Sequence, residues 1–227
     1  MRATHRNILV IGGTSGLGLE IALLLSKEGP SVFVTGRKNP GQKNLIYLNL
    51  DITSDAEKLS VDLDRVIERV KLIHLLVYAA GFYQENLISN LSNSDITSMI
   101  NVGLLAPALL LQKILHTQNE LPEFIAITST SQWIPRLKEP LYAAVKAGLA
   151  ALAHSVSLDS RVAKVLVIGP AGMKTKFWKG AKRENNSTLL NPKWIAERIL
   201  ELNKDNFKYQ LVRILRDPPR VELVEQE

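Results

Sequence analysis

The chain alternates between short apolar runs and longer segments whose apolar positions recur every three to four residues. An apolar run of strand length bounded by glycine, proline or polar residues is typical of a buried strand, and spacing near 3.6 residues is typical of an amphipathic helix. The runs predict about seven strands, over residues 7–13, 31–37, 44–53, 72–81, 123–131, 163–170 and 207–215. The helical spacing predicts helices over residues 15–30, 55–70, 92–118, 141–157 and 192–202, the third of them kinked at Pro107.

Strands and helices alternate along the chain, and the strands are apolar on both faces. This combination predicts an α/β fold with a Rossmann-like, doubly wound parallel sheet flanked by helices on both faces. No composition break divides the chain, so we expect a single domain over residues 1–227. Residues 174–191 form a polar excursion before the last helix, and the charged tail over residues 216–227 is expected to fray.

The turn between the first strand and the first helix, residues 11–18, is rich in glycine. Gly12, Gly16 and Gly18 allow a tight turn and a close approach of the main chain to a ligand. The free N–H groups and the positive dipole end of the following helix favour an anion, and the hydroxyls of Thr14 and Ser15 add donors. In this strand–turn–helix context the pattern favours a dinucleotide over a merely tight connection.

The end of the second strand indicates which dinucleotide fits. NAD-binding sites place a carboxylate there for the ribose 2′-hydroxyl, but this chain has Arg37 instead. A guanidinium suits a 2′-phosphate, so the sequence favours NADP(H) over NAD(H), although Arg37 also fits a solvated loop charge. Asp51, at the end of the third strand, is open to two interpretations: contact with the adenine edge, or a place in the N-terminal cap region of the next helix.

One predicted helix carries Tyr142 and Lys146, whose spacing puts both side chains on one face. A phenol is a poor acid–base catalyst at neutral pH, and a neighbouring cation favours its ionised form. The pair therefore suits proton transfer in the interconversion of a carbonyl and an alcohol. The alternative is an incidental pair in which Lys146 extends to solvent.

Two further polar residues make the incidental pairing less attractive. Ser129 ends the fifth predicted strand, at the sheet edge where ligands bind in such folds. Asn101 lies in the long helix among apolar residues, and a buried amide needs a hydrogen-bond partner.

A hydrolase built from Ser129, His154 and Asp159 is disfavoured, because no G-x-S-x-G elbow is present. The four histidines show no metal-binding spacing, so we expect no catalytic metal.

Composition bears on the class of partner and on the cellular compartment rather than on the reaction. The net charge is +6 and the pI about 9.5, but the basic residues are scattered, which argues against a nucleic-acid-binding module. There is no cysteine, which excludes disulfides and thiolate catalysis and fits a reducing compartment. No uninterrupted apolar run has the length of a membrane span, and the N-terminus lacks the features of a secretory signal, so we expect a soluble, cytoplasmic protein that binds no membrane.

With these residues together, the chain resembles the short-chain dehydrogenase/reductase family over nearly its full length. Six motifs carry the resemblance, and their order and spacing make it specific. They are Gly12-x-x-x-Gly16-x-Gly18, YAAG at 78–81, NVG at 101–103, ITS at 127–129, Tyr142-x-x-x-Lys146 and PAGMKT at 170–175.

The resemblance implies a role for each matched residue. Tyr142 is the acid–base group, Lys146 holds the nicotinamide ribose and lowers the pKa of Tyr142, Ser129 orients the substrate oxygen, and Asn101 holds a water in a proton relay. The resemblance also implies a homodimer or homotetramer that forms through the helices carrying Asn101 and Tyr142. The implied contacts with the cofactor add Leu17, Ile52, Ala79, Ala80, Gly81, Pro170, Ala171, Met173 and Thr175.

The chain departs from the family pattern at three places. Ile11 stands where a threonine usually precedes the first glycine, Tyr78 and Ala79 replace a pair of asparagines, and Ala171 replaces a glycine. None of these changes removes a residue expected to do chemistry, but each one bears on cofactor affinity. A non-catalytic dinucleotide sensor or scaffold on the same fold is therefore the alternative to an NADPH-dependent carbonyl reductase or alcohol dehydrogenase.

The excursion at residues 174–191 is the expected substrate loop. Phe177 and Trp178 offer apolar contact area from this loop, and the other walls are expected to consist of Phe82, Tyr83, Ser131 and Trp133. Plain packing explains each aromatic residue equally well. The loop is short, which favours a small or open-ended carbonyl substrate.

Overall fold

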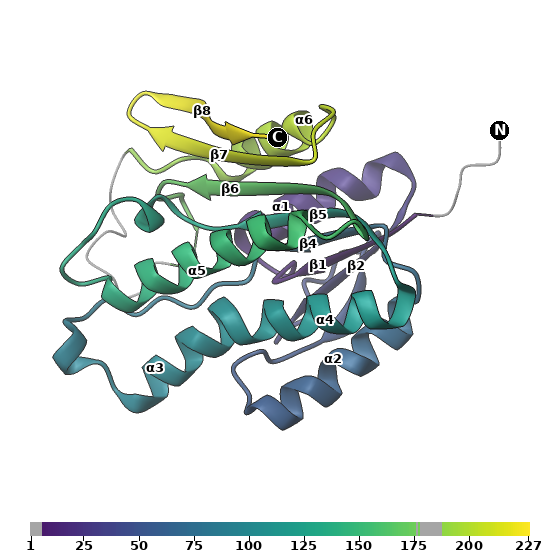
Figure 1. The fold of residues 1–227 in the computed structure, drawn as a ribbon, viewed down its shortest axis with the longest axis horizontal. Coiled ribbons are helices and arrows are strands. Elements are labelled where there is room, and N and C mark those ends of the chain that lie inside the picture. Colours follow the sequence, from purple (N-terminus) through teal and green to yellow (C-terminus); the bar gives the residue numbers. More distant parts are fainter. Residues whose placement is uncertain (1–5, 176, 178–187) are drawn as a thin grey trace.

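The computed structural model describes residues 6–175, 177 and 188–227. One eight-stranded sheet forms its centre, with the strand order β3-β2-β1-β4-β5-β6-β7-β8 (Figure 1). The strands are β1 (Asn7–Ile11), β2 (Ser31–Gly36), β3 (Ile46–Asn49), β4 (Leu75–Tyr78), β5 (Leu121–Ile127), β6 (Val162–Pro170), β7 (Tyr209–Arg216) and β8 (Pro219–Gln226). All neighbouring strands are parallel except β7 and β8. The order reverses at β1, as in a doubly wound sheet, which confirms the predicted Rossmann-like fold.

The central strands are apolar on both faces because helices cover both faces. In β1, Leu9 and Ile11 join the core on one face of the sheet, while Ile8 and Val10 join the core on the other. All four residues of β4 are buried. This double burial explains why these strands appear in the sequence as continuous apolar runs.

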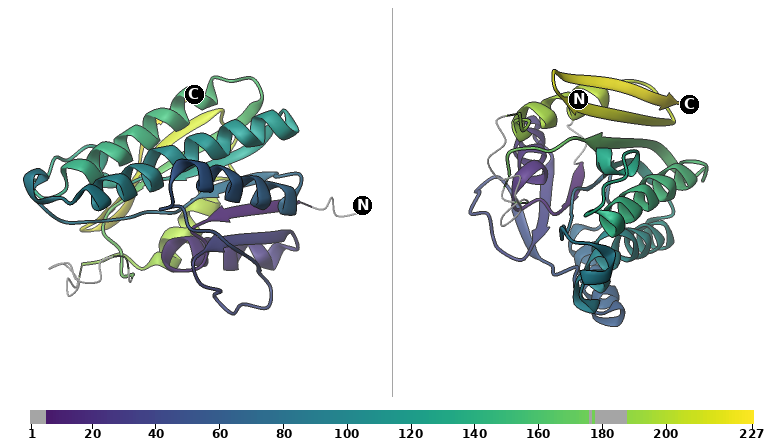
Figure 2. Two further views of the ribbon diagram at one scale, coloured as in Figure 1. Left: turned by 90° about the horizontal axis from the view of Figure 1, so that it is seen from below. Right: turned by 90° about the vertical axis from the view of Figure 1, so that its left-hand side faces the viewer.

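Six α-helices surround the sheet within the described part of the chain. They are α1 (Gly16–Leu25), α2 (Ala56–Val70), α3 (Asn93–Ile100), α4 (Ala106–Gln118), α5 (Pro140–Ser157) and α6 (Pro192–Leu202). Helices α2, α4 and α5 pack on one face, and α1 and α6 lie side by side on the other (Figures 1 and 2). Polar side chains cap three of them: Asp55 caps α2, Ser92 and Asp95 form a capping box at α3, and Asn191 caps α6.

The predicted helix over residues 92–118 is interrupted. A π-helical segment, Asn101–Leu105, separates α3 from α4. Pro107 follows directly, and a proline ring clashes with the carbonyl four residues earlier in a regular α-helix, so a wider turn accommodates it. By length and mean hydropathy alone, Asn93–Gln118 could cross a membrane, although it contains no uninterrupted apolar run of that length. Half of its apolar window is buried inside the protein, as in a core helix.

The expectation of a frayed tail over residues 216–227 is wrong. The tail forms β8, which pairs antiparallel with β7 along its whole length. Arg213 on β7 makes an ion pair with Glu222 on β8, and the Lys208 N–H donates to the Glu227 carbonyl. The sheet therefore has eight strands instead of about seven.

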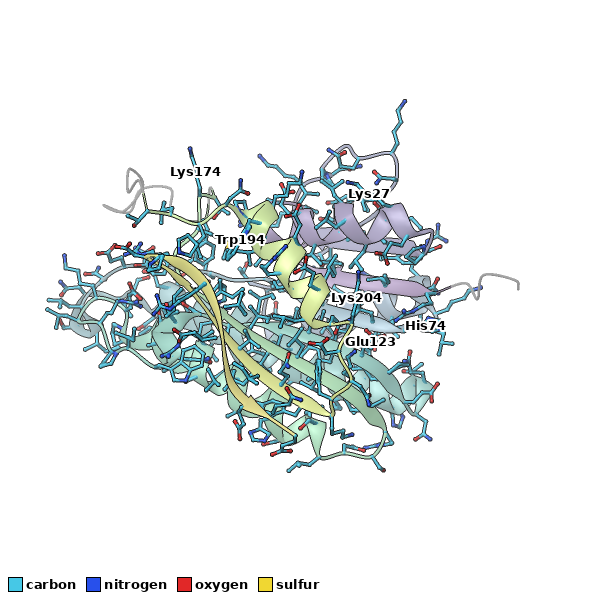
Figure 3. The ribbon with its side chains drawn as sticks, turned by 90° about the horizontal axis from the view of Figure 1, so that it is seen from above. Lys27, His74, Glu123, Lys174, Trp194 and Lys204 are labelled. Atoms are coloured by element: carbon cyan, nitrogen blue, oxygen red, sulfur yellow. The ribbon has the colours of Figure 1, made fainter. Side chains whose placement is uncertain are left out.

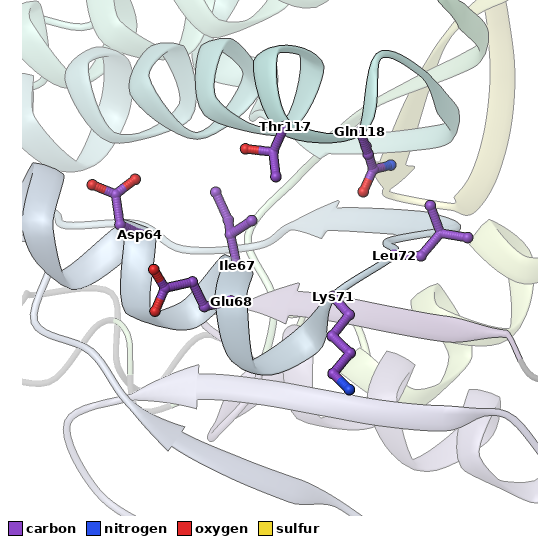
Figure 4. Close-up of a pocket in the computed structure, with 7 residues that line it drawn as sticks. All are labelled: Asp64, Ile67, Glu68, Lys71, Leu72, Thr117 and Gln118. Atoms are coloured by element: carbon purple, nitrogen blue, oxygen red, sulfur yellow. The ribbon is translucent and has the colours of Figure 1, made fainter.

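The two ends of the sheet differ in character. Lys174 lies just beyond the carboxyl end of β6, whereas His74 and Glu123 lie near the amino ends of β4 and β5, at the opposite side of Figure 3. A pocket of about 440 Å³ between the last turns of α2 and α4 also lies at the amino end, where the Gln118 side chain bonds the main chain just before β4 (Figure 4). The residues expected to bind a dinucleotide follow the carboxyl ends of the strands, so that pocket is a separate surface feature.

Candidate active site

The glycine turn after β1 has a shape that side chains would block. Gly12 has φ +78°, and a Cβ there would lie 2.7 Å from the main chain of Ala80. A Cβ on Gly18 would lie 2.4 Å from the Gly12 carbonyl oxygen, and Gly16 also has a positive φ, +55°. Ser15 is the N-cap of α1, yet its side chain makes no capping hydrogen bond to the described helix, so the first N–H groups of α1 point toward the turn.

Three segments far apart in the sequence meet at this turn. Ala79 and Ala80, after β4, pack against Gly18 and Gly12. The Thr175 side chain approaches the position of a Cβ on Gly16 to 3.5 Å. Gly81 lies next to Lys146: a Cβ added to Gly81 would lie 3.8 Å from the Lys146 ammonium nitrogen. The cofactor residues expected from the sequence are therefore brought together from the ends of β1 and β4 and from the segment after β6.

The remaining expected cofactor contacts have clear structural positions. Leu17 is buried in the core that α1 forms with the sheet, and Ile52 packs against the opposite core. Pro170 ends β6, the Ala171 N–H donates to the Ile214 carbonyl at 2.8 Å, and Met173 forms an isolated bridge with Leu190. These contacts hold the segment after β6 against β7, beside the glycine turn.

Arg37 and Asp51 lie close enough to influence each other. Arg37 is exposed after β2, and the Thr14 side chain packs over neighbouring Gly36. Burial raises the pKa of Asp51, but hydrogen bonds from the Thr53 hydroxyl and N–H, together with the Arg37 and Lys58 charges, give a net lowering. Since Asp55 caps α2, Asp51 instead stabilises the turn before that helix.

Tyr142 and Lys146 share the buried face of α5, with 5% and 4% of their surface exposed. Pro140 lies in the first turn of this helix, where its missing N–H costs no hydrogen bond. The Lys146 ammonium lies 5.9 Å from the centre of the Tyr142 ring and donates to the Ile127 carbonyl at 3.0 Å. Lys146 therefore does not extend to solvent, and the ammonium lies at the carboxyl end of β5, close to Ser129.

The ionisation of these two groups depends on burial and on their neighbours. Burial raises the pKa of the Tyr142 phenol, the Ser129 hydroxyl lowers it, the Glu139 carboxylate raises it and Arg136 lowers it, with a net increase. Burial lowers the pKa of Lys146 to about 8. Lys146 is not among the groups that shift the pKa of Tyr142, so the lowering of that pKa by Lys146 that the resemblance implied is not found. Tyr142 is thus protonated at neutral pH, and Lys146 is a cation that burial destabilises.

A polar network behind Ser129 was not anticipated from the sequence. The Ser129 hydroxyl donates to Ser131 at 3.2 Å, and Ser131 donates to the Glu139 carboxylate at 2.8 Å. Arg136 makes an ion pair with Glu139 at 3.0 Å and donates to the Ser131 hydroxyl at 2.6 Å. Glu139 is only 1% exposed. Its place three residues before Tyr142, at the start of the same helix, was the available sequence signal.

Aromatic side chains surround the Tyr142 phenol. Tyr83 packs edge-on against Tyr142 with ring centres 5.1 Å apart, and its hydroxyl bonds Glu139 at 3.3 Å. The ring centres of Phe177 and Tyr142 are 6.2 Å apart. Trp133 instead packs on Gly169 of β6, and Phe82 packs against the core. Of the expected substrate residues, Tyr83, Ser131 and Phe177 are brought to the site. Trp178 and most of the 174–191 loop lie outside the described residues.

Asn101 is buried, with 6% of its surface exposed, and begins the π-helical segment. Its side-chain N–H donates to the Ser54 carbonyl at 2.8 Å. The partner that a buried amide requires is therefore a main-chain group in the turn before α2. This bond connects the π-helical segment to that turn.

His154 faces a different part of the molecule. It lies twelve residues after Tyr142 on α5, about 18 Å along the helix. Its ring stacks on Tyr209 and its Nε2 lies 3.3 Å from the Glu227 carboxylate. His154, Glu225 and Glu227 form the group of potential metal ligands found among the described residues, and all three are exposed or half-buried. The distance separates His154 from Ser129 and excludes the hydrolase arrangement.

Comparisons with known proteins agree with this geometry. A family model described as short chain dehydrogenase matches residues 6–186. The 3-oxoacyl-[acyl-carrier-protein] reductase MabA of Mycobacterium bovis is 28% identical over 174 residues, which cover 75% of this chain and 70% of that protein. A short-chain dehydrogenase from Streptomyces avermitilis has a TM-score of 0.80 at 20% identity and covers 96% of this chain and 90% of its own. A short-chain dehydrogenase from Sphingobium yanoikuyae in complex with NADPH has a TM-score of 0.77 at 16% identity, with 92% and 87% covered. Because the family model matches most of the chain, this protein belongs to the short-chain dehydrogenase family and is an oxidoreductase.

Proposed function

We propose that this protein is an NADPH-dependent carbonyl reductase, or an alcohol dehydrogenase in the reverse direction. One observation carries the proposal: the buried Tyr142 phenol has Ser129 and the Lys146 ammonium beside it, and Lys146 lies near the segment that packs on a tight glycine turn at the N-terminus of α1, a place that suits a phosphate-bearing ligand. A scaffold would need the turn but would not need a buried phenol among these groups.

The residues present fit a nicotinamide dinucleotide. The close approach of Gly12 to Ala80 and the N-terminus of α1 suit a pyrophosphate, and Thr175 and Lys146 lie at the other end of the same region. The exposed Arg37 guanidinium beside Thr14 suits a 2′-phosphate, which favours NADP(H) over NAD(H). When bound, the nicotinamide supplies or accepts a hydride.

The protein residues handle the proton and the orientation. Tyr142 is protonated at neutral pH, so it can donate its proton to the carbonyl oxygen as that oxygen becomes negative. The Ser129 hydroxyl donates its single proton to Ser131 in this structure, so it must turn that O–H toward the substrate oxygen when a carbonyl binds. The Ser131 N–H, which donates to the Ser129 oxygen at 3.1 Å, holds that oxygen in place. The Lys146 ammonium, buried one helical turn from the phenol, would hold the ribose of the nicotinamide.

The surroundings of Tyr142 suggest a class of substrate. Tyr83 and Phe177 offer aromatic surfaces on one side of the phenol, which suits a carbonyl with a small apolar substituent. The MabA relative is named for reduction of a 3-oxoacyl thioester, so short 3-oxoacyl thioesters and esters belong in the first substrate screen beside simple ketones.

We also infer a homodimer or homotetramer that forms through α4 and α5. Small residues face outward on both helices: Ala108, Ala144 and Ala151 are exposed, and Ala147 is half-buried. A flat face of small side chains allows close packing of two helices against a second copy. Light scattering coupled to size-exclusion chromatography would measure the oligomeric state.

The first experiment is a titration of NADPH and NADH into the wild-type protein and the Arg37→Ala variant, followed by nicotinamide fluorescence. We expect NADPH to bind more tightly than NADH, and we expect the variant to lose about tenfold in NADPH affinity with little change for NADH, because only NADPH carries the 2′-phosphate. The same protein is then screened for NADPH oxidation with the carbonyl panel. Binding of neither cofactor would mean that the substitutions at Ile11, Tyr78 and Ala171 have removed the cofactor site. Cofactor binding without reduction of any carbonyl would favour the non-catalytic sensor or scaffold.

A further inference from the structure

Tyr78 ends β4 at the position where the family pattern has an asparagine, and no catalytic step uses it. The side chain is 1% exposed, and its hydroxyl donates to the Val102 carbonyl at 2.5 Å. Val102 lies in the π-helical segment that begins at Asn101. A buried phenol hydroxyl therefore donates to a main-chain carbonyl inside a helix.

The sequence explains why the carbonyl is available. In the π-helical segment the Ala106 N–H donates to the Asn101 carbonyl, five residues back. The next bond of this spacing would join the nitrogen of residue 107 to the Val102 carbonyl, but residue 107 is a proline and has no N–H. A buried carbonyl without a donor is destabilising, and the Tyr78 hydroxyl supplies the missing donor. Tyr78 and Pro107 thus form a matched pair, although they are far apart in the sequence.

This bond fixes a segment that touches the active site from behind. Asn101, at its start, bonds the Ser54 carbonyl. Gly103, at its centre, packs so closely on α5 that a Cβ would lie 2.6 Å from the Val145 side chain. Val145 is adjacent to Lys146, so a shift of the π-helical segment would displace the helix that carries the catalytic pair.

We propose that Tyr78 is a positioning residue for the proposed reductase activity. Its hydroxyl occupies the Val102 carbonyl that Pro107 leaves without a donor, and it thereby holds Asn101 and the Gly103 contact with α5 in place. The inference rests on the proposed function for its catalytic consequence, and on the hydrogen-bond geometry alone for its structural one.

The test is a double-mutant cycle of Tyr78→Phe and Pro107→Ala, measured as kcat for NADPH-dependent carbonyl reduction and as hydrogen–deuterium exchange over residues 101–106. Tyr78→Phe should lower kcat at least tenfold and speed exchange of the Ala106 amide, because the Val102 carbonyl loses its donor. Pro107→Ala alone should leave kcat within threefold. In the double variant the N–H restored at position 107 can reach Val102, so kcat should recover to within threefold of the Pro107→Ala variant.

Tyr209→Phe is the matched control, since Tyr209 is also buried but lies on β7 beside His154. We expect it to leave kcat and exchange over residues 101–106 unchanged. A Tyr78→Phe variant with kcat within threefold of wild type, or an equal loss of kcat with proline and with alanine at position 107, would overturn the proposal. If the wild-type protein reduces no carbonyl substrate, the proposed function fails. The exchange cycle then decides the inference by itself: rescue by Pro107→Ala supports it, and no rescue overturns it.

Discussion

Two of the buried phenols, those of Tyr78 and Tyr142, have surroundings that differ completely. Tyr78 and Tyr142 are 1% and 5% exposed, and burial raises the pKa of both. Among the described residues, no charged neighbour offsets or adds to burial at Tyr78, whose hydroxyl donates to a main-chain carbonyl. Tyr142 instead has Ser129, Glu139 and Arg136 around it.

Because both phenols are buried but only Tyr142 has polar and charged neighbours, burial alone does not make a catalytic tyrosine. A phenol bonded to a fixed carbonyl has one favourable arrangement, so it can only hold structure in place. A phenol among titratable groups has a proton affinity that a ligand can change, because each neighbouring charge favours one protonation state. Substitutions at the two phenols and at their neighbours test this distinction, and those at Tyr142 should have the largest effect.

Replacing Tyr142 should separate the two roles most sharply. Tyr142→Phe removes the proton donor, and we expect kcat to fall about 10³-fold, or about 4 kcal/mol in the activation barrier. The free energy of unfolding should change by less than about 1 kcal/mol, since no main-chain carbonyl loses its donor. Rates at saturating carbonyl substrate and urea unfolding measure both quantities. A variant that keeps more than a tenth of the wild-type kcat would contradict the role of Tyr142.

Lys146 should make stability depend on pH in a defined direction. Its pKa is about 8 in the folded protein against an ordinary value of 10.5, so between these pH values the unfolded chain binds the extra proton. The Lys146 contribution is therefore constant and unfavourable below pH 8 and improves as pH rises toward 10.5. The difference in unfolding free energy between wild type and Lys146→Met should shift by about 3 kcal/mol in favour of wild type over this window.

Urea unfolding of both proteins at about pH 7.5 and about pH 10.5 provides the measurement. Taking the difference between the two proteins cancels the other groups that titrate in this range. A difference that stays flat with pH would mean that the buried ammonium keeps its ordinary pKa. The Lys146–Ile127 bond would then have to compensate for burial fully.

How far the sequence predicts the fold depends on which side chains are buried. The apolar runs identified β1, β4, β5 and β6 because those strands are buried on both faces. The same reasoning missed β8, since most of its residues are exposed and the apolar alternation is limited to Val221 and Leu223. Its pairing comes from main-chain hydrogen bonds and from charged pairs such as Arg213 with Glu222, which a pattern of apolar residues cannot reveal.

The contacts of the site also fall into two groups, those that local spacing predicts and those that it does not. Local spacing predicts that Tyr142 and Lys146 share a helix face, and the structure agrees. The bonds that tie Ser131 to Glu139 and Tyr78 to Val102 depend on how separate segments are packed, and no periodicity encodes them. Pro107 indicated an interruption of its helix, but the wider turn before it required the contacts on both sides.

The Arg136–Glu139 pair offers the smallest and most specific test of the contrast. Glu139 is 1% exposed and the Arg136 side chain 28%, so Arg136→Met leaves a buried carboxylate without this cation and should cost about 2 kcal/mol of unfolding free energy. Adding Glu139→Gln should recover more than half of that loss, because the uncompensated charge is removed. Urea unfolding of both single variants and the double variant gives the coupling free energy.

The same Glu139→Gln variant tests whether Tyr142 responds to its surroundings. The Glu139 carboxylate raises the pKa of Tyr142, so its loss should lower that pKa and shift the pH profile of alcohol oxidation toward lower pH. Tyr78 has no such neighbour within the described part of the chain, and Tyr78→Phe should change the height of the profile without moving it along the pH axis. If Glu139→Gln changes only the height as well, then the Glu139 carboxylate fixes geometry rather than proton affinity, and the distinction between the two phenols lies in Ser129 and Arg136.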